Sequence, residues 1–446
     1  MKRVVIIGNG ISGITAARTI RKLRPDWRIS VISAETDHFF SRTALMYIYM
    51  GHLNYEDTKP YEDWFWQKNR IDLVRGYVSN IDTEHRSLQL GDGQIMTYDV
   101  LILAVGSQYN KFGWPGDDLP GVQGLVTYPD LQLMEDNTRD VDRAVVVGGG
   151  LIGIEMAEML HSRGIHVTFL VREDAYMSYI FPPEESELIH RQIRANGVDL
   201  RLGTEVDRLE PGSDGRVAAV VTKNGERIFC GFVGLTVGVR PNLTVTRSTG
   251  IETGRGILVN ECFETNLPSV YAIGDCAEFR SPLPGRKSVE QLWYTGRIHG
   301  ETVGLTVAGK RTAYDPGVFF NSAKFFNLEY QTYGDVQPAL PDTQDTVYWE
   351  HPDGARSIRI NYDRGTGAVV GFNLMGIRYR QEVCERWISD GAGIRDVLSQ
   401  LGRANFDPEF FHQFEKDVVE AYNRGERDEA VRLTRRRGLS EVEAAA

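Results

Sequence analysis

The chain contains the same glycine-rich pattern twice. Residues 4–20 read VVIIGNGISGITAARTI, and residues 144–160 read AVVVGGGLIGIEMAEML. Each copy has a run of β-branched residues, then GxGxxG, then a helix-forming stretch, which predicts a strand, a tight turn and a helix. Because the pattern recurs at domain spacing, it constrains the fold more than any other feature of the sequence.

The first copy has the spacing of a dinucleotide-binding turn. Gly8 makes the tight turn, Gly10 lets the backbone approach a pyrophosphate, and Gly13 lets the helix pack on the strand. A helix predicted at about 11–23 would point its unpaired N–H groups at the phosphates. The strand RISVIS then leads to Glu35, whose carboxylate would accept a hydrogen bond from a ribose hydroxyl.

The second copy predicts a second site. Gly148, Gly150 and Gly153 take the three glycine positions, and HVTFLV follows as the next strand. Two such sites in one chain suggest two different dinucleotides, a flavin that stays bound and a nicotinamide coenzyme that exchanges.

Length, composition and charge set the outer limits. A chain of 446 residues is expected to form two or three domains. No run of 18 apolar residues is present, so no membrane span is expected. The predicted strand at Val4 leaves no room for a signal peptide, which favours a cytoplasmic location. The net charge of -11 argues against nucleic acid or an anionic membrane as the general partner, since both would be repelled.

The four cysteines, Cys230, Cys262, Cys276 and Cys384, are scattered and form no CxxC pair. This spacing favours neither a disulfide framework nor a zinc site, and we expect no bound metal. We expect the cysteines to be small buried residues.

Three further stretches carry a family resemblance. They are YDVLILAVGS at 98–107, GLTVGVRPN at 234–242 and TNLPSVYAIGDCAEF at 265–279. Together with the two glycine turns, they resemble the FAD-dependent pyridine nucleotide-disulfide oxidoreductases, and in particular the ferredoxin and rubredoxin reductases. The resemblance covers about 1–335 well and the remainder loosely.

The resemblance implies an α/β fold with two Rossmann-like dinucleotide-binding domains and a C-terminal α+β domain. The FAD-binding domain is expected to be discontinuous, at 1–112 and 246–310, with the NAD(P)-binding domain inserted at 113–245. Residues 311–446 are expected to form the C-terminal domain, of a kind that often mediates dimers.

Three expectations concern the C-terminal domain itself. The stretch FDPEFF predicts a helix start, with Asp407 as N-cap and Pro408 at the first helical position. The tail TRRRGLSEVEAAA, residues 434–446, is expected to be solvated. By the resemblance, an aromatic side chain near Phe320 and Asn321 approaches the flavin ring.

The resemblance also implies which residues hold FAD. Asp275 would bind the ribityl chain, with a simple helix cap as the alternative. Arg42 would lie by the phosphates, with a surface salt bridge as the alternative. The expected FAD set is Gly8, Gly10, Ser12, Gly13, Glu35, Arg42, Val78, Ala104, Gly106, Gly274 and Asp275.

The choice between NADH and NADPH stays open. Val171 stands where NADH enzymes usually have an acid, and Arg172 could pair with a 2′-phosphate, yet Glu173 beside it would repel one. This balance leans slightly to NADPH, with an ordinary surface role as the alternative for Arg172. The expected NAD(P) set is Gly148, Gly150, Ile152, Gly153, Arg172 and Gly238.

Hydride transfer from the nicotinamide to the flavin N5 is the reaction that the resemblance implies. Glu155 matches a family glutamate near the nicotinamide, and its alternative is a helix residue favoured by the dipole. Glu290 and Trp293, from the helix expected at 289–304, are candidates beside the flavin pyrimidine, with purely structural roles as the alternative.

The position aligned with the redox cysteine of coenzyme A disulfide reductases is Thr43, which cannot form a mixed disulfide. Electrons would therefore leave the flavin directly, for a ferredoxin-like or rubredoxin-like protein, a small oxidant or oxygen. Tyr47 stands where the ferredoxin reductases usually have a lysine, which counts against that acceptor. Two alternatives remain: an NAD(P)H oxidase, and a flavoprotein with mainly an assembly role, similar to apoptosis-inducing factor. A homodimer is expected by analogy alone.

Overall fold

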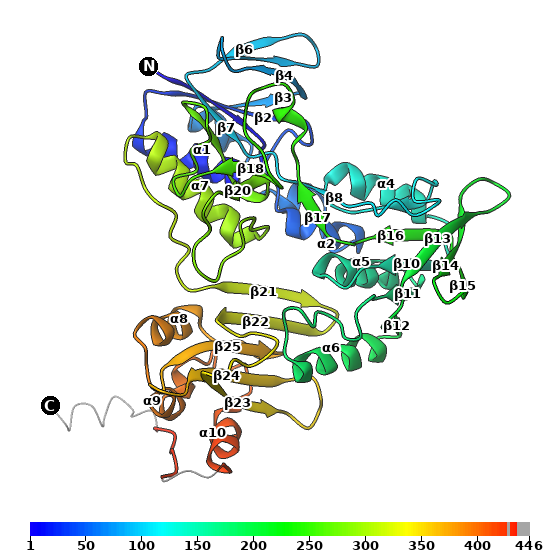
Figure 1. Ribbon diagram of the computed structural model, residues 1–446, viewed down its shortest axis with the longest axis vertical. Helices are drawn as coiled ribbons and strands as arrows, with labels where there is room; N and C mark the ends of the chain where they lie inside the picture. The colour runs from blue at the N-terminus through cyan, green and yellow to red at the C-terminus, as the bar shows by residue number, and fades with distance from the viewer. Residues whose placement is uncertain (426–428, 435–446) are drawn as a thin grey trace. The chain divides into compact units, whose positions relative to one another are not determined.

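The computed structural model describes residues 1–425 and 429–434 (Figure 1). The chain forms two compact units. The first unit contains residues 1–172 and 204–316, and the second contains residues 173–203 together with the chain from residue 317 onwards. The division of the first unit into an FAD-binding and an NAD(P)-binding domain stays a prediction.

The first glycine pattern lies in a parallel sheet of order β19-β7-β1-β2-β3. Its β1 residues Val4 to Ile7 are buried, as expected for a strand covered on both faces. The predicted helix at 11–23 and the predicted strand RISVIS are both confirmed. The elements are β1 (Arg3–Ile7), α1 (Ile11–Leu23), β2 (Arg28–Ser33), β3 (Ile71–Arg75), β7 (Val100–Leu103) and β19 (Val270–Ala272).

The second glycine pattern lies in another parallel arrangement, in which β10 pairs with β11 on one side and β16 on the other, and β16 pairs with β9. The predicted strand, turn and helix are again confirmed. The elements are β9 (Val122–Gln123), β10 (Arg143–Val147), α5 (Leu151–Ser162), β11 (His166–Leu170) and β16 (Phe232–Leu235).

Smaller elements complete the first unit, and α7 packs along α1. The helices are η1 (Arg42–Ala44), α2 (Leu45–Tyr49), η2 (Glu56–Thr58), α3 (Trp64–Lys68), α4 (Tyr128–Thr138), η3 (Thr244–Thr246), η4 (Gly274–Cys276) and α7 (Trp293–Val307). The strands are β4 (Val78–Asp82), β5 (Ser87–Leu90), β6 (Ile95–Thr97), β8 (Ser107–Tyr109), β13 (Val206–Pro211), β14 (Val217–Thr222), β15 (Arg227–Phe229), β17 (Val239–Pro241), β18 (Ile257–Val259) and β20 (Ala277–Phe279).

The second unit is built on an antiparallel sheet of order β21-β22-β25-β24-β23. A buried ion pair joins α6 to this sheet, because Arg359 Nε on β24 donates to Glu185 Oε1 at 2.6 Å. The strands are β12 (Asp199–Arg201), β21 (Phe320–Phe325), β22 (Leu328–Gly334), β23 (Gln344–Glu350), β24 (Ser357–Asp363) and β25 (Val369–Met375). The helices are α6 (Pro183–Ala195), α8 (Gln381–Ser389), α9 (Ile394–Ser399), η5 (Leu401–Arg403) and α10 (Glu415–Asn423).

The predicted helix start at Asp407 and Pro408 is wrong. Asp407 instead closes a turn: its carboxylate accepts from the Glu409 N–H at 3.0 Å, and its carbonyl accepts from the Phe411 N–H at 2.8 Å. Phe410 is 79% exposed, so the segment buries no apolar face that would stabilise a helix. The next helix, α10, begins at Glu415. Residues 435–446 of the predicted solvated tail lie outside the described residues.

Candidate functional site

The two glycine turns share one geometry. Gly8 and Gly148 have φ of +114° and +123°, in the left-handed region that favours glycine. A Cβ on Gly8 would lie 2.0 Å from the Ala104 carbonyl oxygen, and one on Gly148 would lie 2.3 Å from the Thr236 oxygen. Each turn is therefore held against the end of a neighbouring strand, and neither position accommodates a side chain.

The open side of the first turn fits a phosphate group. Gly10 is the N-cap of α1, so the cap has no side chain to cover the first N–H groups of the helix. A Cβ on Gly10 would meet no protein atom within 4 Å. Gly13, by contrast, packs inward, because its Cβ would lie 2.1 Å from the Gly8 oxygen. The helix terminus therefore presents backbone donors and its positive dipole end to open space.

Glu35 and Arg42 meet beside this turn. The Glu35 carboxylate accepts from Arg42 Nη1 at 2.8 Å and Nη2 at 2.6 Å, and from the Tyr128 N–H at 2.8 Å. Arg42 Nη1 also donates to the Val126 carbonyl at 2.6 Å. Burial lowers the pKa of Arg42, but the Glu35 carboxylate and other carboxylates nearby together raise it by more, so the guanidinium stays charged. The salt bridge given as the alternative for Arg42 is present, and the Arg42 side chain remains 38% exposed. Its predicted place by the FAD phosphates stays a prediction.

Asp275 lies in η4, directly after β19, and its Oδ2 accepts from Ser107 Oγ at 2.9 Å. Burial raises the pKa of this carboxyl, while the Ser107 hydroxyl and the charge of Arg42 oppose the rise. Gly274 packs on Ser12, because a Cβ on Gly274 would lie 2.5 Å from Ser12 Oγ. The structure thus brings Ser12, Gly274 and Asp275 together at the first turn.

Three other members of the predicted FAD set differ in their surroundings. The Ala104 N–H donates to the Ile7 carbonyl at 2.8 Å, which places Ala104 against the first turn. Gly106 has φ of +69°, and a Cβ there would meet no atom within 4 Å. Val78 is buried at the start of β4, in the separate sheet β4-β5-β6.

The predicted coenzyme residues surround the second turn. Gly150 is the N-cap of α5, and Ile152 and Glu155 lie in its first two turns. Gly238 has φ of +88°, and its carbonyl accepts from the Asn110 N–H at 3.0 Å. Arg172 is exposed just after β11. The hydrogen bond from Lys223 lowers the pKa of Glu205, and the charge of Arg172 adds to that lowering.

The Glu155 carboxyl has a pKa above its ordinary value. Burial, and then the neighbouring Glu158, raise the pKa of the Glu155 carboxyl to about 7. The group can therefore hold or release a proton near neutral pH, which is the property needed of a proton carrier.

We expect Glu155→Gln to stabilise the protein at alkaline pH. Because the folded pKa lies above the ordinary value of 4.5, the stability linked to the protonated form is complete below pH 4.5 and is lost as pH rises through 7. The glutamine variant avoids this loss and should gain about 1–3 kcal/mol near pH 8.5, with little difference near pH 4.5. Urea unfolding at both pH values measures the gain. Glu301→Gln, on the exposed side of α7, is the control, and a pH-independent difference would contradict the assignment.

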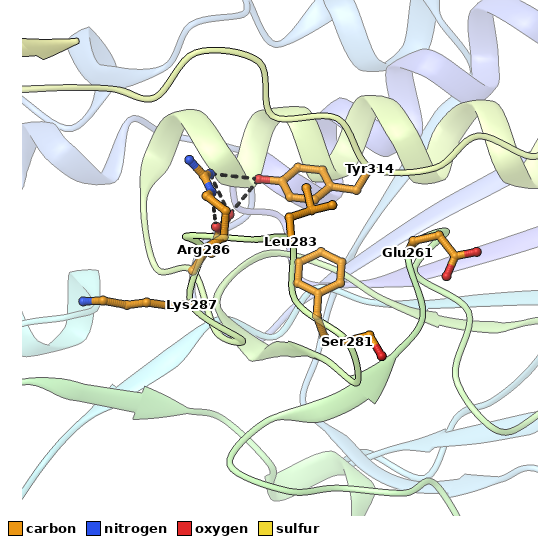
Figure 2. A pocket seen from close by; sticks show the side chains of 8 residues that line it. Glu261, Ser281, Leu283, Arg286, Lys287 and Tyr314 are labelled. Carbon is orange, nitrogen blue, oxygen red and sulfur yellow. Dashed lines mark hydrogen bonds and ion pairs between the residues drawn. The ribbon is translucent and has the colours of Figure 1, made fainter. Parts of the chain in front are cut away.

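The roles predicted for Glu290 and Trp293 beside the flavin stay predictions, and the structure gives their protein neighbours. Helix α7 begins only at Trp293, whose ring lies 5.3 Å from Tyr294. Glu290 precedes the helix, is buried, and accepts from Arg286 Nε at 2.5 Å and from the Tyr314 hydroxyl at 2.6 Å. Figure 2 shows this network at a small pocket. Its lining residues are Glu261, Phe279, Ser281, Leu283, Arg286, Lys287, Glu290 and Tyr314.

Sequence reasoning missed four contributors to these sites. Ser107 ends the stretch YDVLILAVGS that carries the family resemblance, so its position beside a cofactor turn could have been expected. Tyr128 contributes a backbone N–H, which leaves no side-chain signature. Thr236 contributes its backbone oxygen against Gly148, and its hydroxyl donates to the Val147 carbonyl at 2.8 Å. His299 accepts from the Gly274 N–H at 3.1 Å, and nothing local in its helix indicates that contact.

Neither metal binding nor a membrane helix is indicated in the described part of the chain. No group of three or more His, Cys, Asp or Glu side chains there could hold a metal ion. Among the same residues, no helix is both long and apolar enough to cross a membrane. All four cysteines are buried and free.

Comparison with known proteins places the chain in a family. Residues 2–300, more than half of the chain, match the pyridine nucleotide-disulphide oxidoreductase family. The chain belongs to this family. The predicted family, its FAD and NAD(P)H cofactors and the oxidoreductase class are thereby confirmed, and the glycine turns described above fit both dinucleotides.

Individual relatives within the family perform different reactions. The nitrite reductase [NAD(P)H] of Bacillus subtilis (strain 168) is 31% identical over 83% of this chain, which spans only 45% of that protein. The rubredoxin-NAD(+) reductase of Acinetobacter baylyi is 30% identical over 64% of this chain and 74% of its own length. The crystal structure of a ferredoxin reductase from Rhodopseudomonas palustris has a TM-score of 0.76 at 25% identity, and the match covers 84% of this chain and 91% of that one.

Proposed function

We propose that the chain oxidises NAD(P)H and passes the electrons from FAD directly to a redox protein of the ferredoxin or rubredoxin kind, or to a small oxidant. The observation that supports electron transfer without a cysteine relay is the burial of Cys276, which adjoins Asp275. Its thiol is fully buried and donates to the Ile273 carbonyl at 3.3 Å. Burial raises the pKa of this thiol to about 12, which disfavours the thiolate that disulfide chemistry needs.

The residues divide between the two dinucleotides. The first turn, Glu35, Arg42 and Asp275 would hold FAD, and the second turn, Arg172 and Gly238 would hold the nicotinamide coenzyme. When bound, FAD supplies an acceptor for a hydride and can release electrons to one-electron partners. Glu155 would hold a proton near the nicotinamide at neutral pH, and the N-terminus of α1 would neutralise the charge of the pyrophosphate.

Re-oxidation of the reduced protein tests the acceptor. Protein reduced anaerobically with NAD(P)H is mixed with a ferredoxin, a rubredoxin or oxygenated buffer, and the flavin absorbance is followed. We expect rapid re-oxidation by one of the redox proteins and slow re-oxidation by oxygen. Rapid re-oxidation by oxygen alone would indicate an oxidase. No re-oxidation, together with a change in elution volume on reduction, would favour the assembly role.

We expect Arg172→Ala to weaken NADPH binding selectively. A guanidinium paired with a 2′-phosphate makes charge-assisted hydrogen bonds, and their loss should raise the KM for NADPH about tenfold or more while leaving the KM for NADH unchanged. Steady-state kinetics with both coenzymes measures this, and Arg208→Ala on exposed β13 is the control. Equal effects on both coenzymes would count against NADPH preference. The cytoplasmic location and a homodimer stay predictions.

A further inference from the structure

His299 is a buried histidine on α7 whose ring nitrogens have distinct roles. The side chain is 0% exposed, and its Nδ1 accepts a hydrogen bond from the Gly274 N–H at 3.1 Å. A nitrogen that accepts from an N–H carries no proton, so the proton of the neutral ring is on Nε2.

Aromatic rings surround the other side of His299. The ring centroids of Phe263, Tyr314 and Phe279 lie 4.5, 4.8 and 5.7 Å away, and the last two meet the imidazole edge to face. Among the described residues, Nε2 has no conventional hydrogen-bond partner. Aromatic faces accept weak N–H contacts, so this setting suits a neutral ring. Burial, and then the charge of Arg286, lower the pKa of His299 to about 3.

The contact holds a turn that is also fixed from its other side. Gly274 has φ of +71°, and a Cβ there would press on Ser12 Oγ at 2.5 Å. The next residue, Asp275, accepts from Ser107 Oγ at 2.9 Å. The turn is thus fixed between α1 and α7, and the histidine supplies the only acceptor that the structure gives to the buried Gly274 N–H within the described chain.

We infer that His299 is a positioning residue for FAD: its Nδ1 fixes the Gly274–Asp275 turn and thereby aims the Asp275 carboxylate at the flavin. The inference rests on the proposed function, in which Asp275 holds FAD. Neither neighbour of His299 on α7 could accept the Gly274 N–H, because Ile298 and Gly300 carry no side-chain acceptor.

Two matched variants test the inference. His299→Asn places an amide oxygen where Nδ1 lies, whereas His299→Gln reaches toward the position of Nε2 and leaves the Gly274 N–H unpaired. The release of FAD from the full-chain holoenzyme is followed by the recovery of free-flavin fluorescence on dilution, and urea unfolding of each variant is measured in parallel.

We expect His299→Asn to release FAD within about threefold of the wild-type rate and His299→Gln to release it about tenfold faster, with similar unfolding midpoints. Equal release by both variants, fast or slow, would overturn the inference while leaving the reductase proposal intact. A wild-type protein that binds no FAD would overturn the proposed function and this inference with it. If His299→Gln fails to fold, His299→Leu takes its place as the variant without an acceptor.

Discussion

Replacing Gly10 by alanine is expected to weaken FAD binding in a protein that still folds. A Cβ at Gly10 would meet no protein atom within 4 Å, so the apoprotein should tolerate the methyl group. The same space is where the backbone at the start of α1 must approach the pyrophosphate. Overpacking this approach should cost about 1–3 kcal/mol of binding, or about ten- to a hundredfold in affinity.

Titration of the apoprotein with FAD, together with its urea unfolding, measures both effects. Gly402→Ala is the matched control, because a Cβ at Gly402 also meets no atom within 4 Å and that residue lies in the second unit. We expect the control to bind FAD like the wild type. A Gly10→Ala variant that binds FAD normally would show that the open side of the first turn is not the pyrophosphate site.

Replacing Gly148 by alanine is expected to separate coenzyme chemistry from flavin binding. The methyl group would lie 2.3 Å from a backbone oxygen of Thr236, at a residue whose φ of +123° already disfavours alanine. The second turn must then shift, and we expect backbone strain of about 1–3 kcal/mol or more at the coenzyme site but not at the flavin site. Reduction by NAD(P)H should slow by about a hundredfold while FAD stays bound.

The equivalent substitution in the first turn provides the matching test of flavin binding. Gly8→Ala meets the Ala104 oxygen at 2.0 Å and should lose FAD instead. Flavin content is read from the visible spectrum, and reduction by dithionite, which needs no coenzyme site, shows that the flavin in Gly148→Ala remains reducible. Loss of FAD from both variants would contradict the separate roles given to the two turns.

Local sterics made part of this structure predictable. The strand, turn and helix around Gly8 and Gly148 follow from residues near one another in sequence, and the structure has them where the pattern predicts. The helix expected at Asp407 failed because a good N-cap is not sufficient when the following residues, such as Phe410, bury no apolar face. Capping signals report where a helix can begin, whereas tertiary burial decides whether it forms.

The candidate site was predictable in its glycines and acids but not in their partners. Glu35 was expected to accept from a ribose, yet its carboxylate pairs with Arg42, seven residues further on, and accepts from the Tyr128 N–H, which comes from a segment far away in the chain. The link from His299 to Gly274 is also long-range. Glu290 accepts hydrogen bonds from Arg286 and Tyr314, and no sequence motif predicts this network. The contacts from Tyr128, His299 and Tyr314 depend on the packing of segments that are distant in sequence, and for that reason the local patterns do not predict them.

Anaerobic stopped-flow mixing of the FAD-loaded protein with NADH and with NADPH, in separate runs, tests the central claim most directly. The visible absorbance of the flavin reports its reduction. We predict rapid bleaching by at least one coenzyme, with NADPH the faster if Arg172 pairs with its 2′-phosphate. Flavin that stays oxidised with both coenzymes, but is reduced by dithionite, would contradict the claim that the second glycine turn delivers a nicotinamide to the flavin.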